Sequence, residues 1–369
     1  MSDVVLPPID HAARRAMIST LASGGHGCDA VLFTDLTDVR WLTGFTGSNG
    51  WAVVRGDDLV LGTDLRYRER AASETASSGA TVVARQQAVD LHAELLRVLR
   101  GSARVGWDAA TTSHAAWERL AEEVALEPLD SLVKVQRRIK DDAEIARIEA
   151  AATATDAALA EVEPMLLATV DHPMTEADVR SELEYRMRRH GADDRSYDTI
   201  VAAGPQHGAR PHHEASRRTI VHGDTVIVDV GALVDGYHSD MTRSWVIGEA
   251  TSRQREIHEL VAASERAGLD AIAAGVTAKA LDDACRAVFD EAGYLDWYLH
   301  GTGHGVGLDI HETPFHSQSS DDVLSAGMVV TVEPGLYRDG FGGFRIEDLV
   351  VVTETGHRVL TQSPKRPLS

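Results

Sequence analysis

The sequence predicts an α+β protein with two domains, on three observations. First, its 369 residues exceed what one hydrophobic core usually organises. Second, short apolar segments and helical patterns share the first 135 residues, which predicts a smaller α/β domain at 1–135. Third, the remainder, 136–369, contains two similar hairpin sequences, each preceded by helices. This order predicts a duplicated helix–hairpin unit in the second domain.

The first domain is expected to contain short apolar strands and an amphipathic helix. The strands are expected at 30–33, 52–54, 59–61 and 81–84. Leucines three and four residues apart, from position 91 to position 99, predict the helix that follows. The glycine-rich stretch at 44–50 lacks the Lys-Ser/Thr ending of a phosphate-binding loop. Nucleotide binding is therefore not expected there.

Helix-capping patterns mark the start of the second domain. Asp141 is followed by Glu144 at the spacing of a capping box, and Thr175 is followed in the same way by Asp178. Gly191 is expected to end the second of these helices. Two more helices are expected near 252–274 and 277–292, between the two hairpins. The alternation of helices and hairpins is what a duplicated α+β unit would give.

Composition limits the classes of function. The formal net charge of −21 argues against nucleic-acid partners and against binding to anionic membranes. With 43% hydrophobic residues and no long apolar run, the chain is typical of a soluble globular protein. The first 18 residues lack the apolar segment of a signal peptide. Only Cys28 and Cys285 are present, which favours neither a disulfide framework nor a thiolate metal site. We therefore expect a cytoplasmic protein.

The two hairpin sequences carry acids at matching positions. VDVGALVDGY at 228–237 aligns without a gap on VEPGLYRDGF at 332–341. Asp229 and Glu333 each end an apolar, β-branched run that predicts a buried strand. The Asp-Gly turn signal at 235–236 brings Asp240 to within a residue or two of Asp229. Strand alternation places Arg345 and Glu347 on one face of their strand.

Four acids on two aligned hairpins indicate metal ions. An isolated buried carboxylate costs about several kcal/mol, so each must be protonated, paired or metal-bound. The alternative is that the acids are ordinary strand ends entering turns. An oxygen-rich site with one imidazole suits Mn²⁺, Co²⁺, Fe²⁺ or Zn²⁺. Two bridged ions typically activate water and polarise a carbonyl or phosphoryl oxygen, so hydrolysis is expected, but the bond cleaved stays open.

The histidines differ in how strongly they point to a site. A lone histidine in a loop is more often solvated or structural than a ligand. His304 stands out, because it lies in the glycine-rich run 301–307 between the acid-bearing strands, where the backbone can approach a ligand closely. His311 follows seven residues later, and His212 lies in RPHHE at 210–214. Spacing alone gives weaker support for placing His311 and His212 in the site.

At these residues the chain resembles the pita-bread-fold metallopeptidases that act on Xaa-Pro bonds, namely Xaa-Pro aminopeptidase (aminopeptidase P) and Xaa-Pro dipeptidase (prolidase). The resemblance covers nearly the whole length and includes a creatinase-like N-terminal domain, with WLTGFTGS at 41–48 and TDLRY at 63–67. In the second domain it rests on five short motifs besides the His304 run. They are YDTIVA at 197–202, PHHE at 211–214, SDMTR at 239–243, VEPG at 332–335 and RIED at 345–348.

The resemblance implies two divalent metal ions per chain, with manganese expected first and cobalt, zinc or iron as alternatives. The implied metal ligands are Asp229, Asp240, His304, Glu333 and Glu347. Asp240 and Glu347 would bridge the ions, and a bridging hydroxide would attack the scissile carbonyl. Glu333 would also carry the proton to the leaving proline nitrogen.

The resemblance also implies roles for residues that do not bind the metals. His212 would steady the tetrahedral intermediate, and His311 would hold the substrate near the scissile carbonyl. Arg345 would support the ligands, and His300 would line the proline side. Tyr197 would form part of the pocket wall.

Proline-containing peptides are the expected substrates, and an Xaa-Pro aminopeptidase is the expected enzyme. The alternative is a dipeptidase, which must read the free proline carboxylate with a cation or a blocking loop. Arg345 lies too close to the metals to decide this, and Arg66 and Arg68 are equally compatible with ordinary surface charges. A phosphotriester hydrolase is another alternative, and the full ligand set disfavours a metal-free binding module. Since the family usually forms dimers, a homodimer is expected.

Overall fold

The structure is a computed structural model that describes residues 5–129 and 132–368. The chain divides into two compact units between Arg137 and Arg138. The smaller unit is Pro8–Arg137, and the larger unit consists of Arg138–Ser369 together with the segment Met1–Pro7. No helix among the described residues is both long and apolar enough to cross a bilayer.

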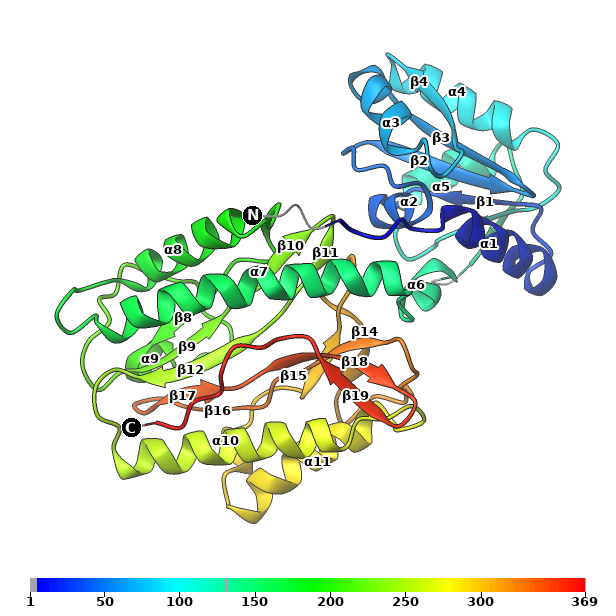
Figure 1. Ribbon diagram of the computed structural model, residues 1–369. Helices are drawn as coiled ribbons and strands as arrows, with labels where there is room; N and C mark the ends of the chain where they lie inside the picture. Colours follow the sequence, from blue (N-terminus) through cyan, green and yellow to red (C-terminus); the bar gives the residue numbers. More distant parts are fainter. Residues whose placement is uncertain (1–4, 130–131, 369) are drawn as a thin grey trace. The chain divides into compact units, whose positions relative to one another are not determined.

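The smaller unit is an α/β structure built on a six-stranded sheet with the order β4-β3-β2-β1-β5-β6 (Figure 1). Its strands are β1 (Ala30–Phe33), β2 (Gly50–Arg55), β3 (Asp58–Asp64), β4 (Thr81–Arg85), β5 (Val105–Trp107) and β6 (Leu126–Pro128). Its helices are α1 (His11–Gly25), α2 (Leu36–Thr43), η1 (Leu65–Tyr67), α3 (Arg68–Glu74), α4 (Ala88–Leu99), α5 (His114–Ala121) and α6 (Leu132–Arg137). Leu91, Leu95 and Leu99 of α4 pack against the sheet. The strands and the leucine-bearing helix predicted for this region are confirmed.

The first half of the larger unit packs two helices on two small sheets of three strands each. The helices are α7 (Asp142–Leu167) and α8 (Glu176–Arg189), followed by β7 (Asp194–Arg195), β8 (Ile200–Ala203), α9 (Gly204–His207), β9 (Thr225–Asp229), β10 (Ala232–Val234), β11 (Tyr237–His238) and β12 (Thr242–Val246). The predicted capping boxes begin both α7 and α8. Val226 and Val228 of β9 face the helices, so Ile227 and Asp229 point to the opposite side of the sheet.

The second half repeats this arrangement with its own helix pair. Its elements are α10 (Ser252–Asp270), α11 (Ala278–Glu291), η2 (Leu295–Trp297), β13 (Gly303–Gly305), β14 (Glu312–His316), β15 (Val329–Val332), β16 (Gly335–Arg338), β17 (Gly342–Arg345), β18 (Asp348–Thr353) and β19 (Gly356–Val359). Val330 and Val332 of β15 pack in the core with α10 and α11. Thr331, and Glu333 beyond the strand end, therefore point to the opposite side.

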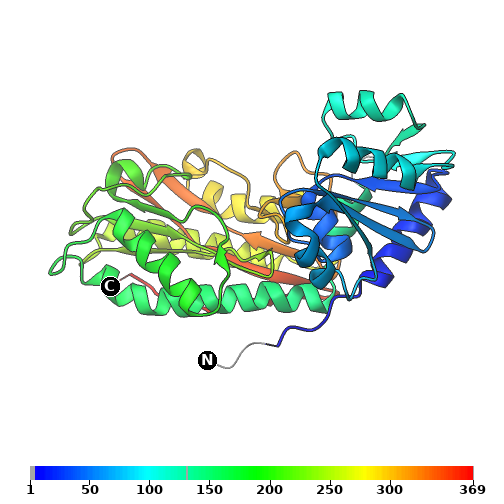
Figure 2. The same ribbon diagram turned by 90° about the horizontal axis from the view of Figure 1, so that it is seen from above.

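The two halves form the predicted duplicated α+β architecture. Figure 1 shows the strands of the larger unit between α7 and α8 on one side and α10 and α11 on the other. In Figure 2, seen from above, the long helix α7 runs along these strands. Because each sheet turns its apolar face to its own helices, Asp229 and Glu333 both lie on the faces that the helices leave open.

The two helices expected near 252–274 and 277–292 are present as α10 and α11, although α10 ends already at Asp270. One local expectation was wrong. The single strand expected through Arg345, Glu347 and Asp348 is broken, because β17 ends at Arg345 and β18 begins at Asp348 in a different sheet. In the break, the Glu347 amide donates to the Thr242 carbonyl (3.1 Å). This bond ties Glu347 to the strand that follows Asp240.

Candidate metal centre

Three acids from separate segments meet at the centre of the larger unit. Asp229 ends β9, and the antiparallel register sets it opposite Thr242, two residues beyond Asp240. Asp235 and Gly236, both with positive φ, form the tight turn between β10 and β11 that brings the chain back. Ligand oxygens of Asp229, Asp240 and Glu347 all lie within 4.8 Å of one another. The structure thus brings together three of the four predicted acids in one cluster.

The cluster concentrates negative charge where water is excluded. Asp240 is 5% and Glu347 1% exposed. Burial and the neighbouring charges of Asp229 and Glu333 raise the pKa of Asp240 well above its usual value. Burial and Asp240 do the same to the pKa of Glu347. A divalent cation would reverse this, because it favours the charged form of every carboxylate around it.

Glu347 shows the fit to a cation most directly. Its Oε2 accepts a hydrogen bond from Thr242 Oγ1 (2.7 Å). Its Oε1 is buried and has no hydrogen-bond partner among the residues that the structure describes. A buried carboxylate oxygen without a donor is costly unless a cation neutralises it. The residues present therefore fit a metal site.

His304 and Glu333 extend the cluster on its other side. The His304 Nδ1–H donates to the Gly305 carbonyl (3.0 Å), which leaves Nε2 facing the acids. Nε2 lies 3.3 Å from Glu333 Oε1 and 3.6 Å from Asp240 Oδ2. Burial alone would raise the pKa of Glu333, but the contact with His304 lowers it to about 2. The donor set of carboxylates and one imidazole suits Mn²⁺, Fe²⁺, Co²⁺ or Zn²⁺.

Arg345 fixes Asp229 from the side. Its Nη2 donates to Asp229 Oδ2 (2.6 Å) and its Nε to Thr242 Oγ1 (3.0 Å). Its Nη1 donates to the Pro211 carbonyl (3.0 Å) and the Tyr337 hydroxyl (2.8 Å). Every guanidinium nitrogen is thus engaged, which makes Arg345 a support for the acid cluster.

Tyr197 links two of the acids. Its hydroxyl lies within hydrogen-bond distance of both Asp229 Oδ1 and Asp240 Oδ1. Burial and the nearby carboxylates raise the pKa of Tyr197 well above its usual value, so the phenol keeps its proton. Because this single hydroxyl proton is shared by two carboxylates, Asp229 and Asp240 have fewer hydrogen-bond donors than their oxygens could accept.

A cavity of about 600 Å³ opens above the acids. It is lined by every residue that the sequence assigned to the site apart from Glu347, namely Tyr197, His212, Asp229, Asp240, His300, His304, His311, Glu333 and Arg345. Ile200, Ile310 and Phe315 contribute apolar wall. The cavity therefore offers polar groups at its base and apolar contacts beside them, as expected of a site for a small organic substrate.

The three other histidines that the sequence assigned to the site line this cavity, as does His316. His300 Nδ1 donates to the Gly301 carbonyl (2.7 Å), and its Nε2 lies 2.9 Å from the Tyr337 hydroxyl. The ring of His311 stands 4.4 Å from the ring of His304, centre to centre. Burial, with the charge of His304, lowers the pKa of His311, so His311 is neutral at pH 7. His212 is exposed to the cavity.

Sequence reasoning missed several residues that hold the site. Thr242 bonds both Glu347 and Arg345, and Tyr337 connects His300 with Arg345. Thr242 lies inside the SDMTR motif and Tyr337 inside the second repeat, so both positions were in view. Nothing in a single sequence indicates which distant partner such a hydroxyl meets. Phe315 likewise gave no sign that it lines the cavity.

Comparison with known proteins places both units. Residues 146–354 match metallopeptidase family M24, and residues 22–139 match the creatinase/prolidase N-terminal domain. An uncharacterized peptidase, YqhT, from Bacillus subtilis is 37% identical over 93% of this chain and 96% of its own length. An Xaa-Pro dipeptidase from Pyrococcus furiosus is 35% identical over 92% of this chain and 95% of its own length.

Solved structures of two kinds share the fold. An Xaa-Pro dipeptidase from Bacillus anthracis has a TM-score of 0.89 and 35% identity, covering 97% of this chain and 99% of the other. An X-Pro aminopeptidase from Thermotoga maritima has a TM-score of 0.86 and 31% identity, with the same coverage of 97% and 99%. The similarity therefore spans both units and includes proteins named for either specificity.

Proposed function

This chain belongs to metallopeptidase family M24 and is a peptidase, and from this premise we propose that it hydrolyses the peptide bond before proline. The observation that carries the proposal is the acid cluster at the base of the cavity, with the unpartnered Glu347 oxygen. Relatives named for Xaa-Pro substrates on both sides of the dipeptidase–aminopeptidase division support the choice of proline.

Two divalent ions, manganese first among them, are proposed to be held by Asp229, Asp240, His304, Glu333 and Glu347. When bound, such ions act as Lewis acids on a carbonyl oxygen and make water nucleophilic at neutral pH. The contribution of the protein is to fix the positions of the metal-binding side chains. Arg345 and Tyr197 bond the carboxylates and hold them in place before any substrate arrives.

The proposed proton path runs through Glu333. With its pKa lowered to about 2, Glu333 is a carboxylate at neutral pH and accepts the proton of the attacking water. It then passes this proton to the leaving proline nitrogen, which must gain one to depart as an amine. Before the first transfer the Glu333 carboxylate lies 3.3 Å from His304 Nε2, and between the two transfers it is the neutral acid that carries the proton.

The cavity histidines are proposed to bind the substrate and the developing charge. His212, exposed to the cavity, donates a hydrogen bond to the oxygen that becomes negative in the tetrahedral intermediate. His311, neutral at pH 7, holds the substrate beside the scissile carbonyl. His300, fixed by Gly301 and Tyr337, lines the side that receives proline.

Within Xaa-Pro specificity, we favour an aminopeptidase that accepts residues after proline. Arg345 is the one Arg or Lys among the described residues that line the cavity, and its nitrogens are all engaged. A free proline carboxylate therefore meets no available cation on this wall. Of the cations in the smaller unit, Arg66 pairs with Asp64 at 2.9 Å. A dipeptidase is the second candidate, favoured by the names of the relatives from P. furiosus and B. anthracis.

The test compares Ala-Pro with Ala-Pro-Ala after dialysis against chelator and resupply of Mn²⁺. Cleavage of the tripeptide supports the aminopeptidase, and cleavage of the dipeptide alone supports the second candidate. Ala-Ala-Ala is the control, since it lacks proline and should resist hydrolysis. If neither proline peptide is cut and a phosphotriester is turned over instead, the proposed substrate class is wrong.

A further inference from the structure

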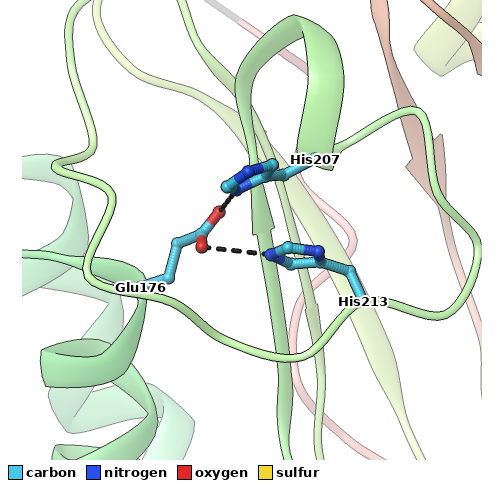
Figure 3. Close-up of side chains that lie close together, drawn as sticks. All are labelled: Glu176, His207 and His213. Atoms are coloured by element: carbon cyan, nitrogen blue, oxygen red, sulfur yellow. Dashed lines mark hydrogen bonds and ion pairs between the residues drawn. The ribbon is translucent and has the colours of Figure 1, made fainter.

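Glu176 is the centre of a second cluster in the larger unit, away from the acids described above. It is the first residue of α8 and is 0% exposed. Its Oε1 accepts hydrogen bonds from the Ala203 amide (2.9 Å) and His207 Nδ1 (2.9 Å). Its Oε2 accepts from His213 Nε2 (3.1 Å) and from the amide (3.0 Å) and hydroxyl (2.6 Å) of Ser216. Figure 3 shows the carboxylate beside the two stacked imidazoles, with one oxygen directed at each of them.

Two histidines beside a carboxylate also resemble a metal site, and their ligand atoms lie within 4.8 Å of one another. The hydrogen bonds argue against that interpretation. Two carboxylate oxygens offer about four lone-pair positions, and five donors already point at them. Burial alone would raise the pKa of Glu176, but these donors lower it, so the charge is compensated without an ion. The cluster is complete as a hydrogen-bonded hub.

The hub joins three segments, two of which, β8 and the loop after α9, line the cavity. Ala203 ends β8, whose first residue, Ile200, pairs with Asp229. His207 ends α9, His213 lies in the 208–214 loop that follows it, and Ser216 lies two residues beyond this loop. The start of α8 adds two backbone bonds to the same stretch, from the Glu176 amide to the Arg218 carbonyl (3.1 Å) and from the Ala177 amide to the Ser216 carbonyl (2.9 Å).

The loop at 208–214 is therefore held on two sides. His213 is 8% exposed and is bonded to Glu176, whereas its neighbour His212 is exposed to the cavity. On the cavity side, the Pro211 carbonyl accepts from Arg345 Nη1 (3.0 Å), and Arg345 in turn bonds Asp229. The two consecutive histidines thus point in different directions, because His212 faces the cavity and His213 faces Glu176.

We propose that Glu176 and His213 form a positioning pair, which holds the 208–214 loop so that His212 reaches the reacting carbonyl. The proposal rests on the Xaa-Pro peptidase function and on the role of His212 given above. Neither Glu176 nor His213 touches the substrate. They act through the backbone of the loop, which sets the position of His212.

The test is His213→Leu in the Mn²⁺-loaded enzyme, with His213→Gln as the conservative variant that keeps an N–H donor. His213→Leu should lower kcat about tenfold and leave KM within about twofold, because His212 acts on the intermediate rather than on bound substrate. His213→Gln should recover part of the loss. The matched control is His190→Leu, which removes another histidine–carboxylate bond (2.7 Å to Glu161) outside the cavity lining and should leave kcat unchanged.

A double-mutant cycle separates positioning from a general structural role. If His213 acts through His212, adding His213→Leu to His212→Ala should lower kcat no further. Effects that multiply in the double variant would overturn the proposal. Bound metal, measured by mass spectrometry, provides a second check. A third ion that is present in the wild type and absent from His213→Leu would identify the hub as a metal site and overturn the proposal.

Hydrogen exchange gives a readout that does not depend on the substrate. The amides of 208–216 should exchange faster in His213→Leu than in wild type, since the loop has lost one of its two anchors. Unchanged exchange together with unchanged kcat would refute the positioning pair. A wild type that cleaves neither Ala-Pro nor Ala-Pro-Ala would instead reject the proposed function, and the exchange result would still decide whether His213 holds the loop.

Discussion

Replacing Asp240 with Asn should affect the metal-free and metal-loaded protein in opposite directions. Asp240 is buried, and its oxygens lie within 4.8 Å of those of Asp229 and Glu347. Without metal, this proximity is repulsive, as the raised pKa of Asp240 indicates. The side-chain amide of the introduced Asn carries no charge, and its carbonyl oxygen can still accept a hydrogen bond from the Tyr197 hydroxyl. The variant should therefore be more stable than wild type when metal is absent and should bind metal poorly.

The magnitude follows from the separation of the charges. Two unit charges no more than 4.8 Å apart repel by at least ~3.5 kcal/mol at an effective dielectric constant of 20. Partial protonation of Asp240 lowers this value, so we expect the metal-free variant to gain about 1–3 kcal/mol in free energy of unfolding. For a unit of this size each kcal/mol shifts Tm by roughly 2–4 °C. Metal-free Asp240→Asn should thus melt several degrees above metal-free wild type.

Thermal unfolding with and without Mn²⁺, beside metal analysis and turnover of Ala-Pro-Ala, measures these effects. Wild type should gain stability on adding Mn²⁺, whereas Asp240→Asn should gain little and show no turnover. Asp283→Asn is the control, because it removes an exposed carboxylate paired with Lys279 (2.8 Å) and should change neither metal content nor activity. A metal-free Asp240→Asn that melts below wild type, or that keeps its metal and turnover, would refute the assignment of Asp240 to the metal centre.

Three further predictions concern other parts of the molecule. Tyr197→Phe removes the hydroxyl shared by Asp229 and Asp240 and should lower kcat/KM about tenfold in steady-state assays with Ala-Pro-Ala. The ring nitrogens of His316 are buried without hydrogen-bond partners among the described residues, and burial lowers the pKa of this histidine from 6.5 to about 4. The unfolded chain therefore binds the proton first, so stability should fall as the pH drops from 6.5 toward 4, by about 3 kcal/mol at most. His316→Leu should lose less stability than wild type between pH 7.5 and pH 5, measured by urea unfolding. Light scattering should detect a dimer of the 39.8 kDa chain, and a monomer at all concentrations would reject that expectation.

Much of the fold could be predicted because local rules decide it. The capping boxes at Asp141 and Thr175 and the apolar runs of β1 to β4 depend on residues within a few positions of one another. The break between β17 and β18 could not be predicted, because Arg345–Asp348 reads as one alternating strand. What divides it is bonding to distant strands, where the Ile346 amide donates to the Pro334 carbonyl and the Glu347 amide to the Thr242 carbonyl.

The acids of the site could be found for a related reason. A carboxylate inside an apolar run conflicts with burial, and that conflict is visible in one sequence. Thr242 and Tyr337 create no such conflict, because a buried hydroxyl is common and can bond many partners. Their roles arise from contacts with Glu347, Arg345 and His300, which are far from them in the chain or visible only after folding.

The two carboxylate clusters differ in how far the protein's own hydrogen-bond donors compensate the buried charge, and this difference supports the proposed metal site. Glu176 and Glu347 are equally buried, and each lies beside other titratable groups. Glu176 accepts five hydrogen bonds and its pKa is lowered, whereas Glu347 accepts one, keeps an oxygen without a partner, and its pKa is raised. The first charge is satisfied by the protein, and the second is left for a cation. The number of hydrogen bonds that each buried carboxylate accepts therefore distinguishes the two clusters, whereas the distances between ligand atoms make both resemble metal sites. The same criterion predicts that Glu347→Gln will lose metal, whereas Glu176→Gln will lose the order of the 208–214 loop and keep its metal.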